Sequence, residues 1–422
     1  NHPETELFKY TNAYYRDRIM VVDTLVGKVL DELKGEGLLE HTIVFYFADH
    51  GGVLPGSKGY LYETGLHVPL VVYVPEKYRS LVPIDPGVEI QGFVSFVDFA
   101  PTVLNLAGIE VPEQMDGTPF LGPGTSETGI NGRDLSFSYA DRFDEKYDLV
   151  RAVRKGKFKY IRNYQPFNFD GLMNNYRYKM LAYQQWDSLF KTGSLNETQA
   201  SFFQTKPVEM LYDLEEDPYE TVNLADHPDH HEILAVMRQQ LDGWMANLPD
   251  LSFYPEHHLI ENAFNDPVDF GQAHQSQMVK YQKVANLALG EFDQVKNGIQ
   301  SSLQSSDSWE RYWALITCNN FGQEAREFQE IIEKISLNDA ELINRVRAAE
   351  YLAISDLRNP NDVMLESLYA STNPAEALLI LNSIVLMESF NYQYEFDMDP
   401  AKLHANVREH DQVQRRLQFL TM

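Results

Sequence analysis

Cysteine, positive charge and long apolar runs are all scarce in this sequence. A single cysteine, Cys318, excludes an internal disulfide framework and any multi-cysteine metal cluster. The 35 Lys and Arg residues face 62 Asp and Glu residues, which gives a net charge of -27. Such a surface repels a phosphate backbone, because nucleic-acid affinity comes largely from cations that displace counterions. No apolar run approaches the roughly 18 residues that a membrane-spanning helix requires. We therefore expect neither a nucleic-acid partner nor a membrane span.

The first residues, NHPETELFKY, also lack the basic start and the apolar run of a signal peptide. A signal peptide that had been removed would leave the same start, and we expect a periplasmic or secreted location. The chain has 422 residues and an apolar share of 44%. At roughly 150 residues per domain, this length predicts two or three domains with a large core.

Residues 1–148 show the alternation of an α/β unit. Apolar residues at three- and four-residue spacing predict a helix over 10–33 with one buried face. Two short β-rich runs, TIVFYFA at 42–48 and VPLVVYV at 68–74, predict strands buried on both faces of a parallel sheet. Helical spacing returns at 94–107. The buried face of the first helix is expected to contain Ile19, Val22, Leu25, Val26, Val29, Leu30 and Leu33.

The next part of the chain has the pattern of short antiparallel strands. The stretch LVRAVRKGKFKYIRN at 149–163 carries a turn signal centred on Gly156, between two strand-like runs. An amphipathic helix at 233–244 closes this part. We interpret residues 149–250 as a small antiparallel subdomain.

Residues 251–422 have less glycine and proline and are predicted to be all-helical. Two stretches of the tail share a pattern, ERYWALITC at 310–318 and NRVRAAEYL at 344–352. Arg and Ala occur at matching positions in both, 34 residues apart, and ALLILNSIV at 377–385 is a looser third copy. This period predicts paired helices stacked as a short solenoid that resembles HEAT-type repeats. An irregular helical bundle is the alternative. In antiparallel pairs, the residues expected to face inward are Trp309, Trp313, Leu315, Ala348, Ala349 and Leu352.

A carboxylate and an imidazole directly follow the first predicted strand, in Asp49-His50-Gly51-Gly52. Ligands of open α/β sheets collect at the carboxyl ends of strands, so these two side chains can share one metal ion. The alternative is a turn in which Asp49 only accepts hydrogen bonds from loop amides. Lys58 follows in the glycine-rich stretch GSKGYLYETG, which lets the backbone turn back toward the metal. A cation beside a metal predicts an anion site, whereas the alternative for Lys58 is a solvated surface lysine.

These residues belong to a longer stretch, FADHGGVLPGSKGYLYETGLHVPLVVYVP at 47–75, that resembles the second half of the catalytic domain of type I sulfatases. Those enzymes are the formylglycine-dependent members of the alkaline phosphatase superfamily. Three further stretches agree: FVDFAPTVLNLAGIEVPEQMDGTPF at 96–120, RAVRKGKFKYIRNY at 151–164 and EMLYDLEEDPYETVNLA at 209–225. Together they cover about residues 5–248 in the family's order. The resemblance implies an α/β fold with an alkaline-phosphatase-like sheet, flanking helices and a small antiparallel subdomain, to which the all-α, HEAT-like tail is added. Residues 1–148 would be the C-terminal half of the catalytic domain.

The resemblance also implies roles for individual residues. Asp49 and His50 take the places of two calcium ligands, and Lys58 takes the place of the lysine that contacts the sulfate ester. A divalent cation and an ammonium around one tetrahedral anion stabilise the charge that develops as the S–O bond breaks. Arg142 is assigned to substrate anion binding, with a surface ion pair to the acidic residues after it as the alternative. His67 is assigned to the pocket, with a purely structural histidine as the alternative.

Two features depart from the sulfatase pattern. The family commonly has Asn after the metal-binding Asp, whereas the nitrogen of His50 is a less natural calcium ligand than an amide oxygen and suits zinc or manganese. The phosphodiesterase branch of the superfamily uses Asp-His for such metals. The nucleophile of the family arises from C/S-x-P/A-x-R, and the lone Cys318 lies in the predicted tail. We therefore expect the formylglycine motif upstream of this chain, on an N-terminal half of the catalytic domain that is physically present.

The leading hypothesis is the hydrolysis of sulfate esters on a carbohydrate by a sulfuric ester hydrolase. A phosphodiesterase or phosphonate monoester hydrolase of the same superfamily is favoured by His50 and disfavoured by Lys58. A noncatalytic interaction protein with helical repeats is the third hypothesis. For an anionic substrate we expect a basic pocket within the acidic molecule, and the α/β half supplies Lys58, Arg142, Arg151, Arg154, Lys155, Lys157 and Lys159.

Overall fold

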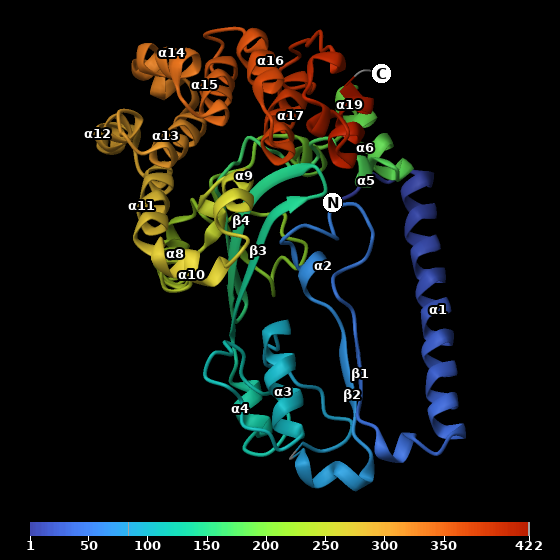
Figure 1. Cartoon of the computed structure of the whole chain (residues 1–422). Coiled ribbons are helices and arrows are strands. Elements are labelled where there is room, and N and C mark those ends of the chain that lie inside the picture. The colour runs from blue at the N-terminus through green and yellow to red at the C-terminus, as the bar shows by residue number, and fades with distance from the viewer. Residues whose placement is uncertain (83, 421–422) are drawn as a thin grey trace.

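The computed structural model describes residues 1–82 and 84–420, which form an extended part and a densely packed part (Figure 1). The extended part contains α1 (Glu6–Gly35), β1 (Val44–Phe47), α2 (Glu63–Leu66), β2 (Leu70–Tyr73), α3 (Phe99–Leu106) and α4 (Glu127–Asn131). Within the described residues, no helix is long and apolar enough to cross a membrane. The α/β class is thus present, with helices and strands alternating along the first part of the chain.

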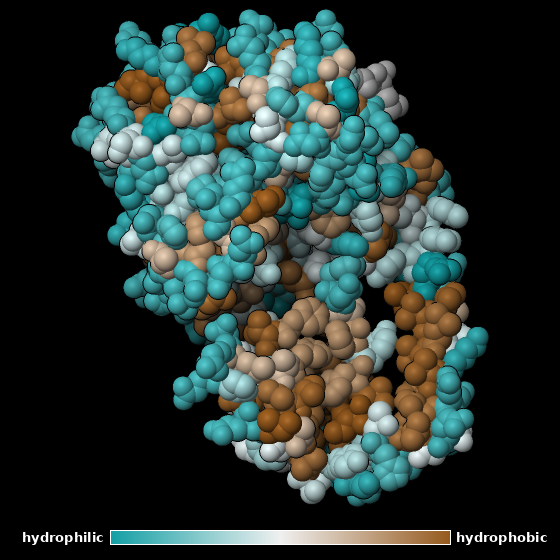
Figure 2. Space-filling view, in the orientation of Figure 1, coloured by the Kyte–Doolittle hydropathy of each residue, from teal (hydrophilic) through white to brown (hydrophobic). Residues whose placement is uncertain are grey.

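The predicted first helix is confirmed as α1, but its apolar face is not buried. Thr5 caps its N-terminus by accepting a hydrogen bond from the N–H of Phe8, whose ring packs edge-on against Trp186. Further along, Leu25 is 54% exposed and Val29 is 56% exposed. Figure 2 shows apolar surface along α1 and over the strands beside it. The expectation of a buried face was wrong because α1 packs against the rest of the described chain near its two ends.

Strands β1 and β2 form a two-stranded antiparallel ribbon, in which Phe45 lies opposite Val72. Both strands occur where the sequence predicts them, but the parallel sheet buried on both faces was wrong. One face of the ribbon packs on α3, where the ring centroids of Phe45 and Phe99 lie 6.2 Å apart. The other face is open, and Val71 is 60% exposed. A short apolar run predicts a strand but carries no signal for the direction of its pairing.

The centre of the dense part is a four-stranded antiparallel sheet in the order β3-β4-β5-β6. Its strands are β3 (Leu135–Phe143), β4 (Lys146–Lys155), β5 (Phe158–Asn163) and β6 (Glu209–Asp213). The predicted turn is confirmed, since β4 and β5 pair across it. Its Gly156 has a φ of 54°, in the left-handed region that glycine adopts most easily.

The two faces of this sheet meet different partners because side chains alternate along a strand. One face contributes Val153 and Tyr160 to the main core of the protein. The other face carries Val150 and Ile161, which pack under Leu61 of the loop before α2. This second face therefore looks toward the stretch that contains Lys58.

Helices cover the first face of the sheet and fill the connection between β5 and β6. They are α5 (Asn175–Tyr178), α6 (Leu181–Lys191), α7 (Glu197–Ala200) and α8 (His231–Asn247). The predicted helix at 233–244 is confirmed as α8, which packs on β4. Its Trp244 stacks on Phe137 of β3 with ring centroids 4.6 Å apart.

The tail is helical, as predicted. Its helices are α9 (Glu256–Asn262), α10 (Pro267–Ala273), α11 (Gln275–Ala285), α12 (Phe292–Leu303), α13 (Ser308–Phe321), α14 (Gln329–Asn338), α15 (Leu342–Ile354), α16 (Asn361–Ala370), α17 (Pro374–Glu388), α18 (Ala405–Arg408) and α19 (Asp411–Leu420). Each of α13, α15 and α17 packs on the helix before it, and α15 also packs on α13 and α17. All six residues expected to face inward are buried, from Trp309 to Leu352.

The last helix returns to the sheet, so that α19 lies against α5 (Figure 1). Its Arg416 is fully buried. Arg416 donates from Nη1 to the carbonyl of Met173 at 2.6 Å and from Nη2 to the carbonyl of Glu145 at 2.9 Å. The tail thereby holds the β3–β4 turn and the segment that leads into α5.

Candidate functional site

The Asp49-His50 turn follows β1 directly. His50 Nδ1 lies 2.7 Å from the carbonyl oxygen of Gly51. A carbonyl oxygen only accepts, so Nδ1 carries the proton and Nε2 of the neutral ring keeps a free lone pair. That Nε2 lies 3.4 Å from Asp49 Oδ2, and the Asp49 side chain is 83% exposed. The lone pair and the carboxylate are thus close enough together to bind the same metal ion.

These two residues fit a metal site as part of its donor set. Calcium takes about six to eight oxygen ligands, and zinc takes about four donors. Across residues 1–82 and 84–420, no group of three or more His, Cys, Asp or Glu side chains gathers closely enough to hold a metal ion. A metal bound by Asp49 and His50 would therefore need further donors from outside the described residues, or from other atom types.

A close backbone approach fixes the position of this turn. The N–H of Gly51 donates to the carbonyl of Gly65 at 2.9 Å. A Cβ atom on Gly51 would lie 1.8 Å from the carbonyl oxygen of Thr64, so only glycine fits there. The turn is therefore held against α2, on which both of these carbonyls lie.

We expect Gly51→Ala to lower the stability of the chain by about 1–3 kcal/mol, the usual cost of overpacking. The obstructing atom belongs to the backbone, so it cannot swing aside as a flexible side chain does. Urea unfolding followed by circular dichroism measures the change. Gly27→Ala is the control, because a Cβ at Gly27 meets nothing within 4 Å. Wild-type stability in Gly51→Ala would contradict the close approach.

Lys58 lies next to the same turn. Its backbone N–H donates to the carbonyl of Gly52 at 3.2 Å. Its Nζ donates to the hydroxyl of Tyr176 at 3.2 Å and lies 5.0 Å from the centre of that ring. In the described part of the chain, the Lys58 ammonium forms no ion pair with a carboxylate. Its charge is therefore not neutralised by a carboxylate of the described residues.

The two other candidate residues have different partners. Arg142 donates from Nη1 to Gln412 Oε1 at 2.7 Å, and its Nη2 lies 3.2 Å from Glu256 Oε1. Both partners belong to the tail, so the ion pair is not with the acidic residues that follow Arg142 in sequence. His67 is exposed, and its Nδ1 lies 3.8 Å from Glu63 Oε2. The backbone of Lys58 thus lies against the Asp49-His50 turn, whereas Arg142 and His67 contact other groups.

The formylglycine motif, which is expected upstream of this chain, also has a match by letter within it. Residues 138–142 read SYADR, which satisfies C/S-x-P/A-x-R by letter. Ser138, however, lies inside β3, opposite Ala152 of β4. Within residues 1–82 and 84–420, Ser138 makes no hydrogen bond to Lys58 or to the Asp49-His50 turn. The letters alone do not make Ser138 a nucleophile.

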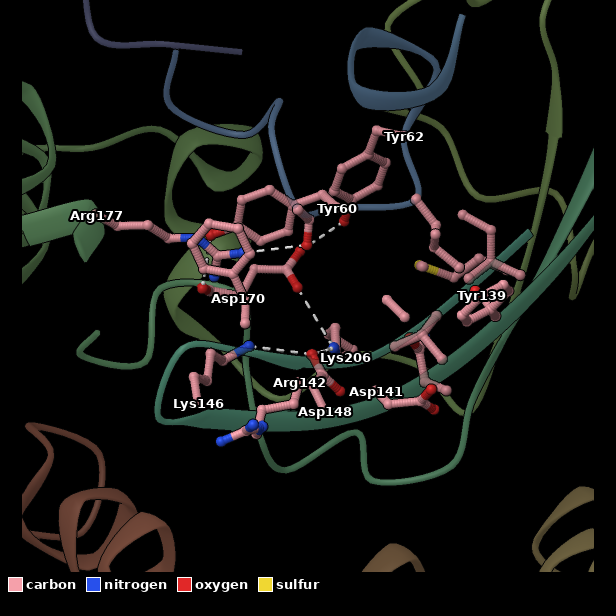
Figure 3. A pocket seen from close by; sticks show the side chains of 18 residues that line it. Tyr60, Tyr62, Tyr139, Asp141, Arg142, Lys146, Asp148, Asp170, Arg177 and Lys206 are labelled. Carbon is pink, nitrogen blue, oxygen red and sulfur yellow. Dashed lines mark hydrogen bonds and ion pairs between the residues drawn. The ribbon is translucent and has the colours of Figure 1, made fainter. Parts of the chain in front are cut away.

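Sequence reasoning did not find the buried ionic network beside the Lys58 loop (Figure 3). Lys146 Nζ lies 3.0 Å from Asp148 Oδ2, and Lys206 Nζ lies 2.5 Å from the same oxygen. Lys206 Nζ also lies 3.3 Å from Asp170 Oδ1, while Tyr62 donates its hydroxyl to Asp170 Oδ2 at 2.7 Å. The only sequence signal was the spacing of Lys146 and Asp148 on one face of a strand. Lys206 and Asp170 come from loops that show no periodicity.

Burial sets the protonation of this network. Burial lowers the pKa of Lys146 to about 8, although the Asp148 carboxylate acts in the opposite direction. Burial also disfavours the charged form of Asp170, but the ammonium groups of Lys206 and Lys146 outweigh it and hold the pKa of Asp170 below its usual value. The network therefore contains the Asp170 carboxylate, which is held in its ionised form, and the Lys146 ammonium, whose charge burial disfavours.

The chain is similar to known sulfatases over part of its length. Residues 4–109 match the sulfatase family model. The chain is 39% identical over 264 residues to an ulvan-active sulfatase of Formosa agariphila, covering 62% of this chain and 43% of the relative. It is 33% identical over 127 residues to human arylsulfatase K, covering 29% of this chain and 22% of the relative.

Among solved structures, a 2-O GAG sulfatase aligns with a TM-score of 0.40 and 20% identity, over 57% of this chain and 44% of that one. The chain spans less than half the length of the curated relatives that it matches. The family match over residues 4–109 and the alignment of 264 residues with an ulvan-active sulfatase show that this chain is similar to sulfatases over more than half of its length.

Proposed function

We propose that the whole protein is a sulfatase that hydrolyses sulfate esters on a carbohydrate. The observation that carries this proposal concerns Lys58, whose backbone lies against the Asp49-His50 turn and whose ammonium has no carboxylate partner within the described residues. A metal held by the turn and this ammonium would together offer one oxyanion a Lewis acid and a hydrogen-bond donor. The names of the relatives, among them an ulvan-active sulfatase, support a polysaccharide substrate. A polymer of this kind supports a periplasmic or secreted location.

In this proposal each residue has a separate task. Asp49 and His50 hold the metal, which supplies Lewis-acid polarisation of the sulfate oxygens when bound. Lys58 donates to a sulfate oxygen and stabilises the charge that moves onto the leaving group. Arg142 and His67 are proposed to contact the anionic substrate at the edge of the site.

The metal in this proposal is calcium, with zinc or manganese as the alternative. The Asp49 carboxylate is a hard oxygen donor, which supports calcium. The free lone pair on His50 Nε2 supports zinc or manganese, and with them the phosphodiesterase alternative. The formylglycine nucleophile is proposed to lie on the N-terminal half of the catalytic domain.

We propose that this N-terminal half also packs on the exposed apolar surface of α1 and of the β1-β2 ribbon. Leu25 and Val29 on α1 and Val71 on β2 are each more than half exposed. Monomeric proteins rarely leave such a continuous apolar surface in water. The relatives are more than twice as long as the part that this chain covers, which leaves room for such a piece.

We also propose the division into three parts: residues 1–148 as the C-terminal half of the catalytic domain, 149–250 as its small antiparallel subdomain, and 251–422 as a HEAT-like domain. The packing of α13, α15 and α17 in a row supports the repeat, with α12, α14 and α16 as their outer partners. Strand β3, which lies in the first part, pairs with β4 at the start of the second. The first two parts are thus proposed to act as one folded unit.

The full-length protein is expected to release sulfate from a sulfated polysaccharide, whereas the 422-residue chain alone is expected to release none. The Asp49→Ala variant of the full-length protein should lose activity and keep its fold, because the Asp49 side chain is largely exposed. Sulfate release by ion chromatography and circular dichroism measure the two outcomes. A wild type that preferred phosphate diesters in the presence of zinc would move the assignment to the phosphodiesterase branch.

A further inference from the structure

Helix α5 holds the loop that carries Lys58 through two neighbouring side chains. Lys58 Nζ donates to the hydroxyl of Tyr176 at 3.2 Å, and Arg177 Nη2 donates to the carbonyl of Gly59 at 3.1 Å. Two consecutive residues of the helix therefore hold two consecutive residues of the loop. The helix lies in the connection between β5 and β6, beyond residues 4–109 that match the sulfatase family model.

The Arg177 contact fixes the loop one residue after Lys58. Figure 3 shows the Arg177 side chain beside Tyr60, and its Cζ lies 4.0 Å from the centre of that ring and 4.4 Å from the centre of the Phe143 ring. Gly59 has a φ of 81°, and a Cβ atom there would lie 2.5 Å from the Phe143 ring and 2.8 Å from Arg177 Nη2. Because Gly59 has no side chain, the loop can approach α5 this closely.

The helix is itself fixed on the end of β3 and on the β3–β4 turn. Asn174 precedes it and is fully buried, and its Nδ2 donates to the carbonyl of Phe143 at 2.7 Å. The N–H of Asn175, the first residue of the helix, donates to the Glu145 carboxylate at 2.7 Å. The backbone of Tyr176, the next residue, is therefore held in place by the sheet.

The side chain of Tyr176 keeps one hydrogen-bond donor unused. Its ring packs edge-on against Phe143, with ring centroids 5.3 Å apart, and the residue is 37% exposed. Its hydroxyl oxygen accepts from Lys58 Nζ, which also lies 5.0 Å from the centre of the ring. Within residues 1–82 and 84–420, the O–H of Tyr176 donates to no acceptor.

The phenol and the ammonium thus present donors side by side. An ammonium has three N–H donors, and the one partner of Lys58 Nζ among the described residues is Tyr176, which leaves two of them for a ligand. Because the phenol oxygen already accepts from a cation, its own O–H is polarised and becomes a stronger donor. The several oxygens of one tetrahedral oxyanion can accept from both groups at once.

We propose that Tyr176 is a second sulfate-binding residue, whose O–H donates to one oxygen of the sulfate group while the Lys58 ammonium donates to another. This inference rests on the proposed function, since it takes Lys58 as the sulfate contact. It adds a contact from α5, which the family match does not reach. The same donor serves the ester and the released sulfate, so Tyr176 contributes to the binding of both.

The test measures the binding of inorganic sulfate to the full-length protein by isothermal titration calorimetry, and the turnover of an aryl sulfate beside it. Tyr176→Phe should weaken sulfate binding about 10–100-fold, the usual effect of one hydrogen bond to a charged group. It should lower kcat/KM by a similar factor. In a Lys58→Ala background, Tyr176→Phe should still weaken sulfate binding, because the O–H donates to sulfate directly. No further loss in that background would leave Tyr176 as a support of Lys58 alone and overturn the proposal.

Tyr369→Phe is the matched control in the tail. Lys402 Nζ lies 5.4 Å from the centre of the Tyr369 ring, and the Tyr369 hydroxyl also accepts a hydrogen bond. Its removal should leave sulfate binding unchanged. Tyr176→Phe should unfold at the wild-type midpoint by circular dichroism, because its hydroxyl is bound by Lys58 alone among the described residues.

The two assays separate this inference from the proposed function. Wild-type sulfate binding in Tyr176→Phe would overturn the inference even in an active sulfatase, and so would a wild type that binds no sulfate. Sulfate binding that depends on Tyr176, in a wild type that releases no sulfate from an ester, would support this site and contradict the proposed function.

Discussion

Lys58→Ala in the full-length protein is expected to lower kcat/KM for a sulfate ester about 10²–10³-fold, on the order of 3–4 kcal/mol. The Lys58 ammonium is held by the Tyr176 hydroxyl and ring and makes no ion pair within the described residues. Its interaction with an oxyanion is therefore not reduced by a neighbouring carboxylate. It contributes most as charge develops on the leaving oxygen, so kcat should fall more than KM rises. Steady-state kinetics on an aryl sulfate measure both constants.

Two further variants test whether the effect is specific to the Lys58 ammonium. Lys58→Arg should restore little activity, because a planar guanidinium places its charge differently from an ammonium. Lys155→Ala is the matched control, since that lysine is partly exposed and pairs with Asp134. Unchanged turnover in Lys58→Ala would remove Lys58 from the mechanism and weaken the sulfatase assignment.

The sequence predicted the local elements of this fold better than their partners. The helical spacing of Leu25 and Val29 predicts α1 correctly, but spacing cannot tell whether the apolar face is covered by this chain or by another piece. Likewise, the apolar run around Phe45 predicts a strand but not an antiparallel ribbon. Both errors concern tertiary contacts of an apolar face, which the spacing of residues within one element does not specify.

The helices of the tail were predicted more fully, because helical periodicity is itself a local signal. The offset between the stretches around Trp313 and Ala348 sets the spacing of α13 and α15, and both residues are buried. Once consecutive helices pair in the same way, the row of α13, α15 and α17 follows. The return of α19 to the sheet has no such signal, because it depends on one contact made by Arg416 across the fold.

The same difference between local and distant contacts applies to the candidate site. The Asp49-His50 turn and Lys58 are close in sequence, and glycines bring their backbones together. Arg142, in contrast, was assigned to an anionic substrate, with an ion pair to its acidic neighbours as the alternative, and the structure pairs it with Glu256 of the tail. A charged side chain on an exposed-looking strand gives no indication of which distant helix will cover it.

Arg416→Met is expected to destabilise the chain by about 3–5 kcal/mol, the usual cost of removing one partner from a buried charged network. Arg416 is fully buried, and burial lowers its pKa to about 10, so it is still charged at pH 7. Its loss leaves the carbonyls of Met173 and Glu145 without these donors. It also leaves the buried Glu145 carboxylate without the cation beside it. Urea unfolding measures the change, and Arg415→Met, at an exposed position of the same helix, should be nearly neutral.

The effect of Arg416→Met should extend to Lys58. Arg416 holds the carbonyl of Met173, Asn175 donates its N–H to the Glu145 carboxylate at 2.7 Å, and Tyr176 follows in the same short helix. Releasing that helix removes the hydrogen-bond partner that fixes Lys58 Nζ. The full-length variant should therefore lose sulfatase turnover at temperatures well below its unfolding midpoint, whereas Arg415→Met should not. Wild-type turnover in folded Arg416→Met would show that the tail stabilises the protein without positioning Lys58.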